Sequence, residues 1–228
     1  MNEYFFKLAH AFVNVAGSDR RFPVHRIYCV GRNYAAHARE IGADPDCEPP
    51  FYFMKPADVI AKSGATILYP PRTKKLHHEI ELVVAIGKPG KDIECSRAQE
   101  HIFGYAVGID LTRRDLQEVA KEERRPWDSG KSFEGAAPIS AIRGVDEIGH
   151  PSVGRIWLEV NGDIRQDGDI KDMIWNVPET IAELSTLFTL ASGDLIYTGT
   201  PAGVGAVTPG DKLTGGIYGI GEIRIEIG

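Results

Sequence analysis

The sequence predicts a β-rich α+β fold with one main domain. Short apolar or alternating runs, separated by Gly, Pro and Asn-Gly turn signals, recur along the 228 residues. Helical patterns are few and do not alternate regularly with the strands, which disfavours a Rossmann or TIM-barrel topology. No internal repeat or low-complexity tract divides the chain. Residues 25–228 are therefore expected to form a single domain, and residues 1–24 a separate N-terminal arm.

The first half of the main domain predicts short strands and two helices. One helix is expected at residues 33–42, where Asn33 is a good N-cap and Gly42 a good C-terminal stop. The second helix is expected at residues 96–102. Continuous apolar or aromatic runs predict strands at residues 26–30, 51–56, 66–69, 78–86 and 104–109.

The second half of the domain repeats this mixture. A helix is expected from Asp110 to about Glu123, before Pro126. Residues 127–138 show no clear periodicity and predict a loop. Another helix follows Pro178, and its apolar stripe is expected in the core: Ile181, Leu184, Leu187 and Phe188. Strands are expected at residues 155–161, which end in the hairpin signal Asn161-Gly162, and at residues 194–197, 211–214 and 222–227.

The composition narrows the class of protein. The net charge is −6 and no basic block occurs, so neither nucleic acid nor an anionic membrane surface is an expected partner. The longest apolar runs are too short to cross a bilayer, and Lys7 and His10 interrupt the N-terminal apolar run, which argues against a signal peptide. Three widely spaced cysteines without a Cys-x-x-Cys pair fit a reducing cytoplasm, with Cys29 as a small core residue.

Three carboxylates form the strongest functional signal. Glu79 and Glu81 alternate with apolar residues in a predicted strand, so both side chains point to the same face. Two like charges there require a positive partner, and Asp110, at the end of a neighbouring strand, would complete an oxygen-rich site for Mg²⁺, Mn²⁺ or Ca²⁺ rather than zinc. The alternative is an ordinary solvated strand face, and spacing alone does not decide between them.

Other polar residues fall near this cluster in the predicted elements. On the helix after Asp110, the residues Arg114, Gln117 and Lys121 share one face, although Lys121 is interpreted as solvated. His37 and Glu40 share a face of their helix. Adjacent strand residues cannot both face one metal ion, so His77 and His78 are interpreted as packing or supporting residues.

A glycine-rich loop follows the strand at residues 194–197. Its sequence is Thr198-Gly-Thr-Pro-Ala-Gly-Val-Gly205, which lacks the Gly-Lys-Ser/Thr ending of a P-loop and the order of a dinucleotide fingerprint. Its backbone N–H groups and hydroxyls suit a small carboxylate. The alternative is a tight turn between two strands.

These motifs together resemble the fumarylacetoacetate hydrolase family, within it the small acylpyruvate and fumarylpyruvate hydrolases. The matching segments span about residues 25–205: Val30-Gly-Arg-Asn-Tyr-Ala-Ala-His37, Met54-Lys-Pro56, Leu76-His-His-Glu-Ile-Glu-Leu82, Gly108-Ile-Asp-Leu-Thr-Arg-Arg-Asp-Leu-Gln117, Pro126-Trp127, Lys131-Ser-Phe133 and Thr198-Gly-Thr-Pro201. Two positions depart from the family pattern. Asp128-Ser129-Gly130 precedes Lys131 where an alanine is usual, and Lys121 replaces an aromatic residue of the longer fumarylacetoacetate enzymes.

The resemblance implies a fold and a set of roles. The fold is the family's own mixed β-sandwich or roll with a few peripheral helices, usually in a homodimer, with Mg²⁺ or Mn²⁺ at the centre. The implied roles are metal ligation by Glu79, Glu81 and Asp110, water activation by His37 with Glu40, oxyanion stabilisation by Lys131, and substrate contact by Arg114, Gln117, Thr200 and Lys55.

The implied reaction is hydrolysis of the C3–C4 bond of a 2,4-dioxo acid, with fumarylpyruvate the preferred substrate. A distal carboxylate on the substrate would need a further cation, and Lys55, Arg32 or Arg113 are candidates. Two alternatives remain open: an oxaloacetate decarboxylase or keto–enol tautomerase on the same fold, and a non-catalytic Ca²⁺-dependent binding module.

Overall fold

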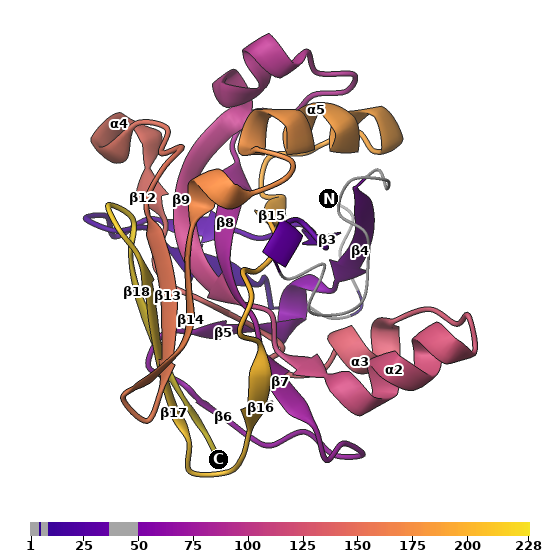
Figure 1. Cartoon of the computed structure of the whole chain (residues 1–228). Coiled ribbons are helices and arrows are strands. Elements are labelled where there is room, and N and C mark those ends of the chain that lie inside the picture. Colours follow the sequence, from indigo (N-terminus) through magenta and orange to yellow (C-terminus); the bar gives the residue numbers. More distant parts are fainter. Residues whose placement is uncertain (1–4, 6–8, 37–49) are drawn as a thin grey trace.

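The computed structural model describes Phe5, residues 9–36 and residues 50–228. Its largest sheet is mixed and follows the order β4 (Phe51–Lys55), β3 (Ile27–Gly31), β15 (Leu195–Tyr197), β8 (Ile80–Ile86), β9 (Ile102–Ile109), β11 (Ala137–Ile139) and β5 (Ile60–Lys62), with β12 (Arg143–Gly144) also paired to β9. A second sheet runs β14 (Asp163–Asp169), β13 (Arg155–Val160), β17 (Lys212–Ile217), β18 (Gly221–Ile227) and β6 (Thr66–Ile67). Figure 1 shows these two sheets curled around each other.

Smaller elements complete the fold. A three-stranded sheet has the order β10 (Thr112–Arg113), β7 (Leu76–His78) and β16 (Gly205–Val207), and an N-terminal hairpin pairs β1 (Phe12–Asn14) with β2 (Arg21–Pro23). The helices that lie wholly within the described residues are α2 (Arg114–Glu122), α3 (Asp128–Lys131), α4 (Val145–Ile148) and α5 (Val177–Leu187), and the 3₁₀ turns there are η1 (Ala57–Val59), η2 (Cys95–His101) and η3 (Ile170–Asp172). In Figure 1, α2 and α3 lie together at one side, and α5 lies above β15.

The core lies between the two large sheets. Every residue of β8 is buried, because β15 and β9 flank the strand while β13 packs on it. Apolar side chains from both sheets form one cluster that includes Cys29, as the sequence predicts. The predicted β-rich α+β class is confirmed, and so is the Asn161-Gly162 hairpin, in which both residues have positive φ between β13 and β14.

Several predicted boundaries are wrong for identifiable reasons. The segment 127–138, expected to be a loop, contains α3 and the start of β11. Neither element shows a sequence periodicity, because α3 is a single turn and β11 is buried throughout. The helix expected from Asp110 begins at Arg114, because Thr112 and Arg113 first pair with β7 as β10. Leu187 and Phe188 are 59% and 36% exposed, so the core stripe of α5 ends at Leu184.

The structure describes the N-terminal part of the chain only in part. The described part of the arm is the β1–β2 hairpin, whose Val13 and Phe22 belong to the main core. The helix expected at residues 33–42 lies mostly outside the described residues. Asn33, expected as its N-cap, instead uses its side chain to bond the backbone of Trp175 and Thr198, 2.7–2.9 Å away, and so joins three distant loops.

Candidate metal centre

The three carboxylates meet because two antiparallel strands end side by side. Glu79 and Glu81 flank the first residue of β8, and Asp110 follows the last residue of β9. Ile80 pairs with Ile109, and the Asp110 N–H donates to the Glu79 carbonyl at 2.8 Å. One oxygen from each of the three carboxylates lies within 4.8 Å of the others, and all three residues are buried. The predicted convergence of Glu79, Glu81 and Asp110 is confirmed.

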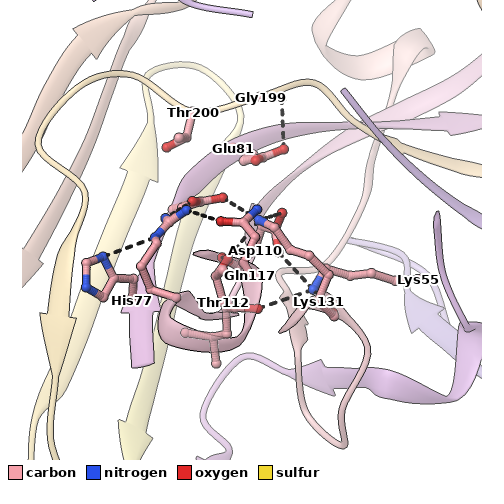
Figure 2. Close-up of polar contacts among 12 residues, drawn as sticks. Lys55, His77, Glu81, Asp110, Thr112, Gln117, Lys131, Gly199 and Thr200 are labelled. Atoms are coloured by element: carbon pink, nitrogen blue, oxygen red, sulfur yellow. Dashed lines mark hydrogen bonds and ion pairs between the residues drawn. The ribbon is translucent and has the colours of Figure 1, made fainter. Parts of the chain in front are cut away.

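Two of these carboxylates have cationic partners. The Lys131 ammonium donates to Glu79 Oε2 at 2.8 Å, Asp110 Oδ2 at 2.7 Å and Thr112 Oγ1 at 2.7 Å. Arg114 pairs with the other oxygen of Glu79. Behind them, Lys55 Nζ lies 2.8 Å from Asp110 Oδ1 and also donates to the backbone carbonyl of Lys131 (Figure 2).

Lys131 stays charged in this setting. Burial lowers the pKa of its ammonium, but Asp110 and Glu79 more than offset that effect, so the pKa is raised overall. An ammonium has three N–H donors, and all three of those on Lys131 are engaged. A role for Lys131 as an oxyanion donor therefore requires that it exchange one of these partners.

Glu81 is the carboxylate without a cation. Within the described ranges, no lysine or arginine pairs with it, and its hydrogen bond comes from the Gly199 N–H at 2.8 Å (Figure 2). Burial raises the pKa of Glu81 well above its ordinary value, and Asp110 and Glu79 raise it further. The three clustered carboxylates, one of which is buried without a cation, form a donor set whose charge a hard divalent cation neutralises. The residues present thus fit Mg²⁺ or Mn²⁺.

A cavity that is partly open to solvent begins at this centre. Its lining includes all three carboxylates, Lys131, Thr200, the face of α2 formed by Arg114, Gln117 and Lys121, and an aromatic wall of Phe51, Phe53 and Trp127. Arg114 Nη1 donates to Gln117 Oε1 at 2.5 Å, which fixes both side chains. The interpretation of Lys121 as a solvated residue is wrong, because this side chain lies over Trp127 at the cavity wall, 5.1 Å from the ring centre.

A buried glutamine that the sequence analysis missed orients Thr200. The Ile80 N–H donates to Gln166 Oε1 at 3.0 Å, which fixes the amide so that its NH₂ faces Thr200 Oγ1 at 2.8 Å. The Thr200 hydroxyl accepts this bond and keeps its own hydrogen for a ligand. His78 Nδ1 contacts the same Gln166 oxygen at 2.9 Å and must therefore donate. Gln166 is the one buried residue of β14, whose other residues are exposed or half-buried, and no local sequence pattern marks it out.

The remaining candidates are placed as follows. His77 and His78 lie outside the carboxylate cluster, as predicted: His77 faces Arg114, and burial lowers its pKa to about 4. Lys55 is buried behind Asp110 and is absent from the cavity lining. Arg113 stacks on Phe133, 4.6 Å from the ring centre, and lines a different groove. The His37–Glu40 pair lies outside the described residues.

The glycine loop forms the predicted tight turn, and its Gly199 N–H donates to the protein's own Glu81 carboxylate. Gly199 has φ +93°, a turn conformation that side chains rarely adopt, and a Cβ there would lie 2.8 Å from the Cβ of Asn33. The turn directs the Gly199 N–H at Glu81 and places Thr200 in the cavity.

None of the helices in the described residues is long and apolar enough to cross a membrane.

Comparisons with known proteins agree with this geometry. Residues 26–227 match the fumarylacetoacetate (FAA) hydrolase C-terminal family. A fumarylpyruvate hydrolase of Ralstonia sp is 50% identical over 185 residues, covering 81% of this chain and 96% of that protein. The mitochondrial oxaloacetate tautomerase FAHD1 of Homo sapiens is 40% identical over 201 residues, covering 88% and 90%. The crystal structure of fumarylpyruvate hydrolase from Pseudomonas aeruginosa in complex with Mn²⁺ and pyruvate has a TM-score of 0.97 and 50% identity, with 99% of each chain covered.

Proposed function

The chain belongs to the fumarylacetoacetate hydrolase family, and we propose that it is a metal-dependent hydrolase that cleaves fumarylpyruvate to fumarate and pyruvate. The observation that carries this proposal is the joint placement of the buried carboxylate trio with Arg114, Gln117 and Thr200 around one cavity. Relatives named for this activity are 50% identical over most of the chain, and one was crystallised with the product pyruvate.

The residues that line the cavity can be matched to the pyruvoyl end of the substrate. Arg114, Gln117 and Thr200 supply hydrogen-bond donors around the carboxylates, which suits the carboxylate and 2-oxo group of a pyruvoyl unit. A divalent cation bound by Glu79, Glu81 and Asp110 supplies Lewis acidity to the ketone end of the substrate. Lys55 and Gln166 act indirectly, since they hold Asp110 and Thr200 in place.

Hydrolysis requires a water molecule to add at C4. The water oxygen forms a bond to C4 while a base takes a proton, and the C4 oxygen becomes an oxyanion. The C3–C4 bond then breaks, its electron pair stays on the pyruvate fragment as an enolate, and protonation at C3 releases pyruvate while C4 becomes the carboxylate of fumarate. We assign the base to His37, oriented by Glu40, and the oxyanion donor to Lys131.

The metal, the assembly, the location and the biological role are inferred from the same proposal. We infer Mg²⁺ or Mn²⁺ as the physiological metal, a homodimeric assembly and a cytoplasmic location, with a role in the breakdown of aromatic compounds. The donor set supports the metal, since oxygen ligands without histidine or cysteine suit hard cations. Size-exclusion chromatography with light scattering tests the assembly.

A direct assay tests the function. The purified protein with Mg²⁺ or Mn²⁺ is incubated with fumarylpyruvate, acetylpyruvate and oxaloacetate, and loss of enol absorbance and release of pyruvate are followed. The proposal expects the highest kcat/KM for fumarylpyruvate. Turnover of oxaloacetate alone would refute it and favour the second candidate, an oxaloacetate tautomerase or decarboxylase, which the 40% identity to the human tautomerase supports.

The variant His37→Ala separates the two reactions. Acylpyruvate hydrolysis needs a base for water, whereas decarboxylation of oxaloacetate needs neither an attacking water nor a base. Replacement of His37 should therefore abolish acylpyruvate cleavage and spare much of any oxaloacetate decarboxylation. Equal loss of both activities would contradict the assignment of His37 as the base for water.

A further inference from the structure

Lys121 is a cation whose charge the centre described above does not use. It lies on the third turn of the α2 face that also carries Arg114 and Gln117, and it lines the same cavity. In the part of the chain that the structure describes, no carboxylate lies within 4.0 Å of its ammonium. Its contact is the face of Trp127, with Nζ 5.1 Å from the ring centre.

We propose that Lys121 is a specificity-determining residue that binds a carboxylate at the far end of the substrate. This inference rests on the proposed function and adds the recognition of a dicarboxylic acylpyruvate over a monocarboxylic one. A half-buried ammonium at a cavity wall, stacked on an aromatic ring and without an acidic partner among the described residues, is a site for an anionic ligand.

The spacing of Arg114 and Lys121 along α2 fits this assignment. Arg114 faces the carboxylate trio, and Lys121 is seven residues further along α2, which places the two Cα atoms about 10 Å apart at 1.5 Å per residue. An extended seven-carbon dioxo acid such as fumarylpyruvate spans roughly 7–8 Å between its end carbons. A substrate whose pyruvoyl end lies at Arg114 can therefore bring its distal carboxylate to Lys121. Acetylpyruvate, with five carbons and no second carboxylate, cannot.

The surroundings of Lys121 are positive and aromatic. Arg32 also lines the cavity and lies over Phe51, 5.4 Å from the ring centre, and the Phe51 and Trp127 rings meet edge to face at 5.2 Å. Burial lowers the pKa of Lys121, and Arg114 and Arg32 lower it further, as expected of a cation in a positive region. The aromatic pair provides flat walls for the conjugated middle of the substrate.

The other predicted cations are less suited to this task. Lys55 is buried against Asp110, and Arg113 lies outside the cavity on Phe133. Arg32 remains in the lining, so it is a candidate for a second contact with the same carboxylate. Lys121 differs from all three because its position follows from α2 itself, which also positions Arg114 and Gln117.

The test compares two substrates on matched variants. Lys121→Met removes the charge at similar length, Lys121→Arg keeps it, and Lys91→Met replaces an exposed lysine as the control. With Mn²⁺ present, Lys121→Met should lower kcat/KM for fumarylpyruvate by about 10- to 100-fold, mostly through KM, and that for acetylpyruvate by no more than about threefold. Lys121→Arg should recover most of the fumarylpyruvate activity, and Lys91→Met should match the wild type on both substrates.

The possible failures are distinguishable. Equal losses on the two substrates, or no loss, would overturn the inference about Lys121 and leave the proposed hydrolase function intact. If the wild type cleaves neither acylpyruvate, the hydrolase function fails, and calorimetric binding of the same two compounds still tests Lys121. In that case, weaker binding of fumarylpyruvate to Lys121→Met would support the subsite, and unchanged binding would refute it.

Discussion

Replacement of Glu81 by glutamine should have opposite effects on the metal-free and metal-loaded protein. Glu81 is 2% exposed, lies beside two other carboxylates and has no cationic partner within the described ranges. Glutamine keeps the size and can still accept the Gly199 N–H, but it carries no charge. The variant Glu81→Gln should therefore stabilise the metal-free protein and lose most of its response to Mn²⁺.

The magnitudes follow from charge and from mass action. A carboxyl whose pKa rises on folding loses about 1.4 kcal/mol of folding free energy for each pH unit between its unfolded and folded pKa values, once both are exceeded. For a chain of this length, 1 kcal/mol corresponds to about 2–4 °C in melting temperature. Metal at 100 times its dissociation constant adds about 2.7 kcal/mol, or roughly 5–11 °C, and the variant should forfeit most of that gain.

The stability of the metal-free protein should depend on pH through Glu81. Because folding raises the pKa of Glu81, the folded state holds its proton more tightly, so the contribution of Glu81 to the stability of the metal-free wild type is greatest below the unfolded pKa. That stability is lost as the pH rises through the folded pKa. The variant Glu81→Gln should lack this slope.

Thermal denaturation monitored by circular dichroism, with EDTA or with Mn²⁺ and at several pH values, measures all three effects. Glu226→Gln, an exposed position on β18, serves as the matched control and should behave as the wild type. A Glu81→Gln protein that is less stable without metal, or that gains as much from Mn²⁺ as the wild type does, would show that Glu81 is not the uncompensated ligand.

Three further predictions follow from the supporting residues. Lys55→Met should destabilise the metal-free protein by about 1–3 kcal/mol in urea denaturation, because Asp110 Oδ1 loses its buried cation while Oδ2 keeps Lys131; an unchanged midpoint would contradict the pairing. Gln166→Leu should lower kcat/KM for acylpyruvates by about tenfold or more by freeing Thr200, and Thr200→Val should then add little in the double variant; additive losses would argue against coupling. Gly199→Ala should lower the melting temperature and metal affinity together, since the turn has φ +93°; normal metal affinity would separate the turn from Glu81.

The sequence was most informative at the carboxylate cluster, where the acidic residue types and the two-residue period of a strand point to the same site. Glu79 and Glu81 could be placed on one face because strand alternation is rigid, and Asp110 could be added because it ends a neighbouring strand. The prediction of one continuous strand through Glu79 is wrong, since β7 and β8 belong to different sheets. The break leaves Glu79 between them, where its carbonyl accepts the Asp110 N–H.

Residues that depend on distant partners were not predictable in the same way. Gln166 has no local pattern that distinguishes it, because its role depends on Thr200 and Ile80, which lie on other strands. Lys121 was interpreted as solvated because a helical period shows only which residues share a face. It does not reveal that Trp127, from the following turn, would cover that face. The one-turn helix α3, which carries Lys131, is too short for any periodicity.

The net charge of the metal-loaded centre favours one kind of substrate over another. Glu79, Glu81 and Asp110 contribute −3 in ionised form, and Lys55, Lys131 and Arg114 contribute +3, so these six groups are neutral together. A bound divalent cation brings this buried set to +2, and a low local dielectric makes such an excess costly. Lys121 lines the same cavity and raises the total to +3, so a substrate with two carboxylates leaves +1, whereas one with a single carboxylate leaves +2. The total charge of the cavity therefore favours the same dicarboxylic acid that Lys121 indicates at the outer wall.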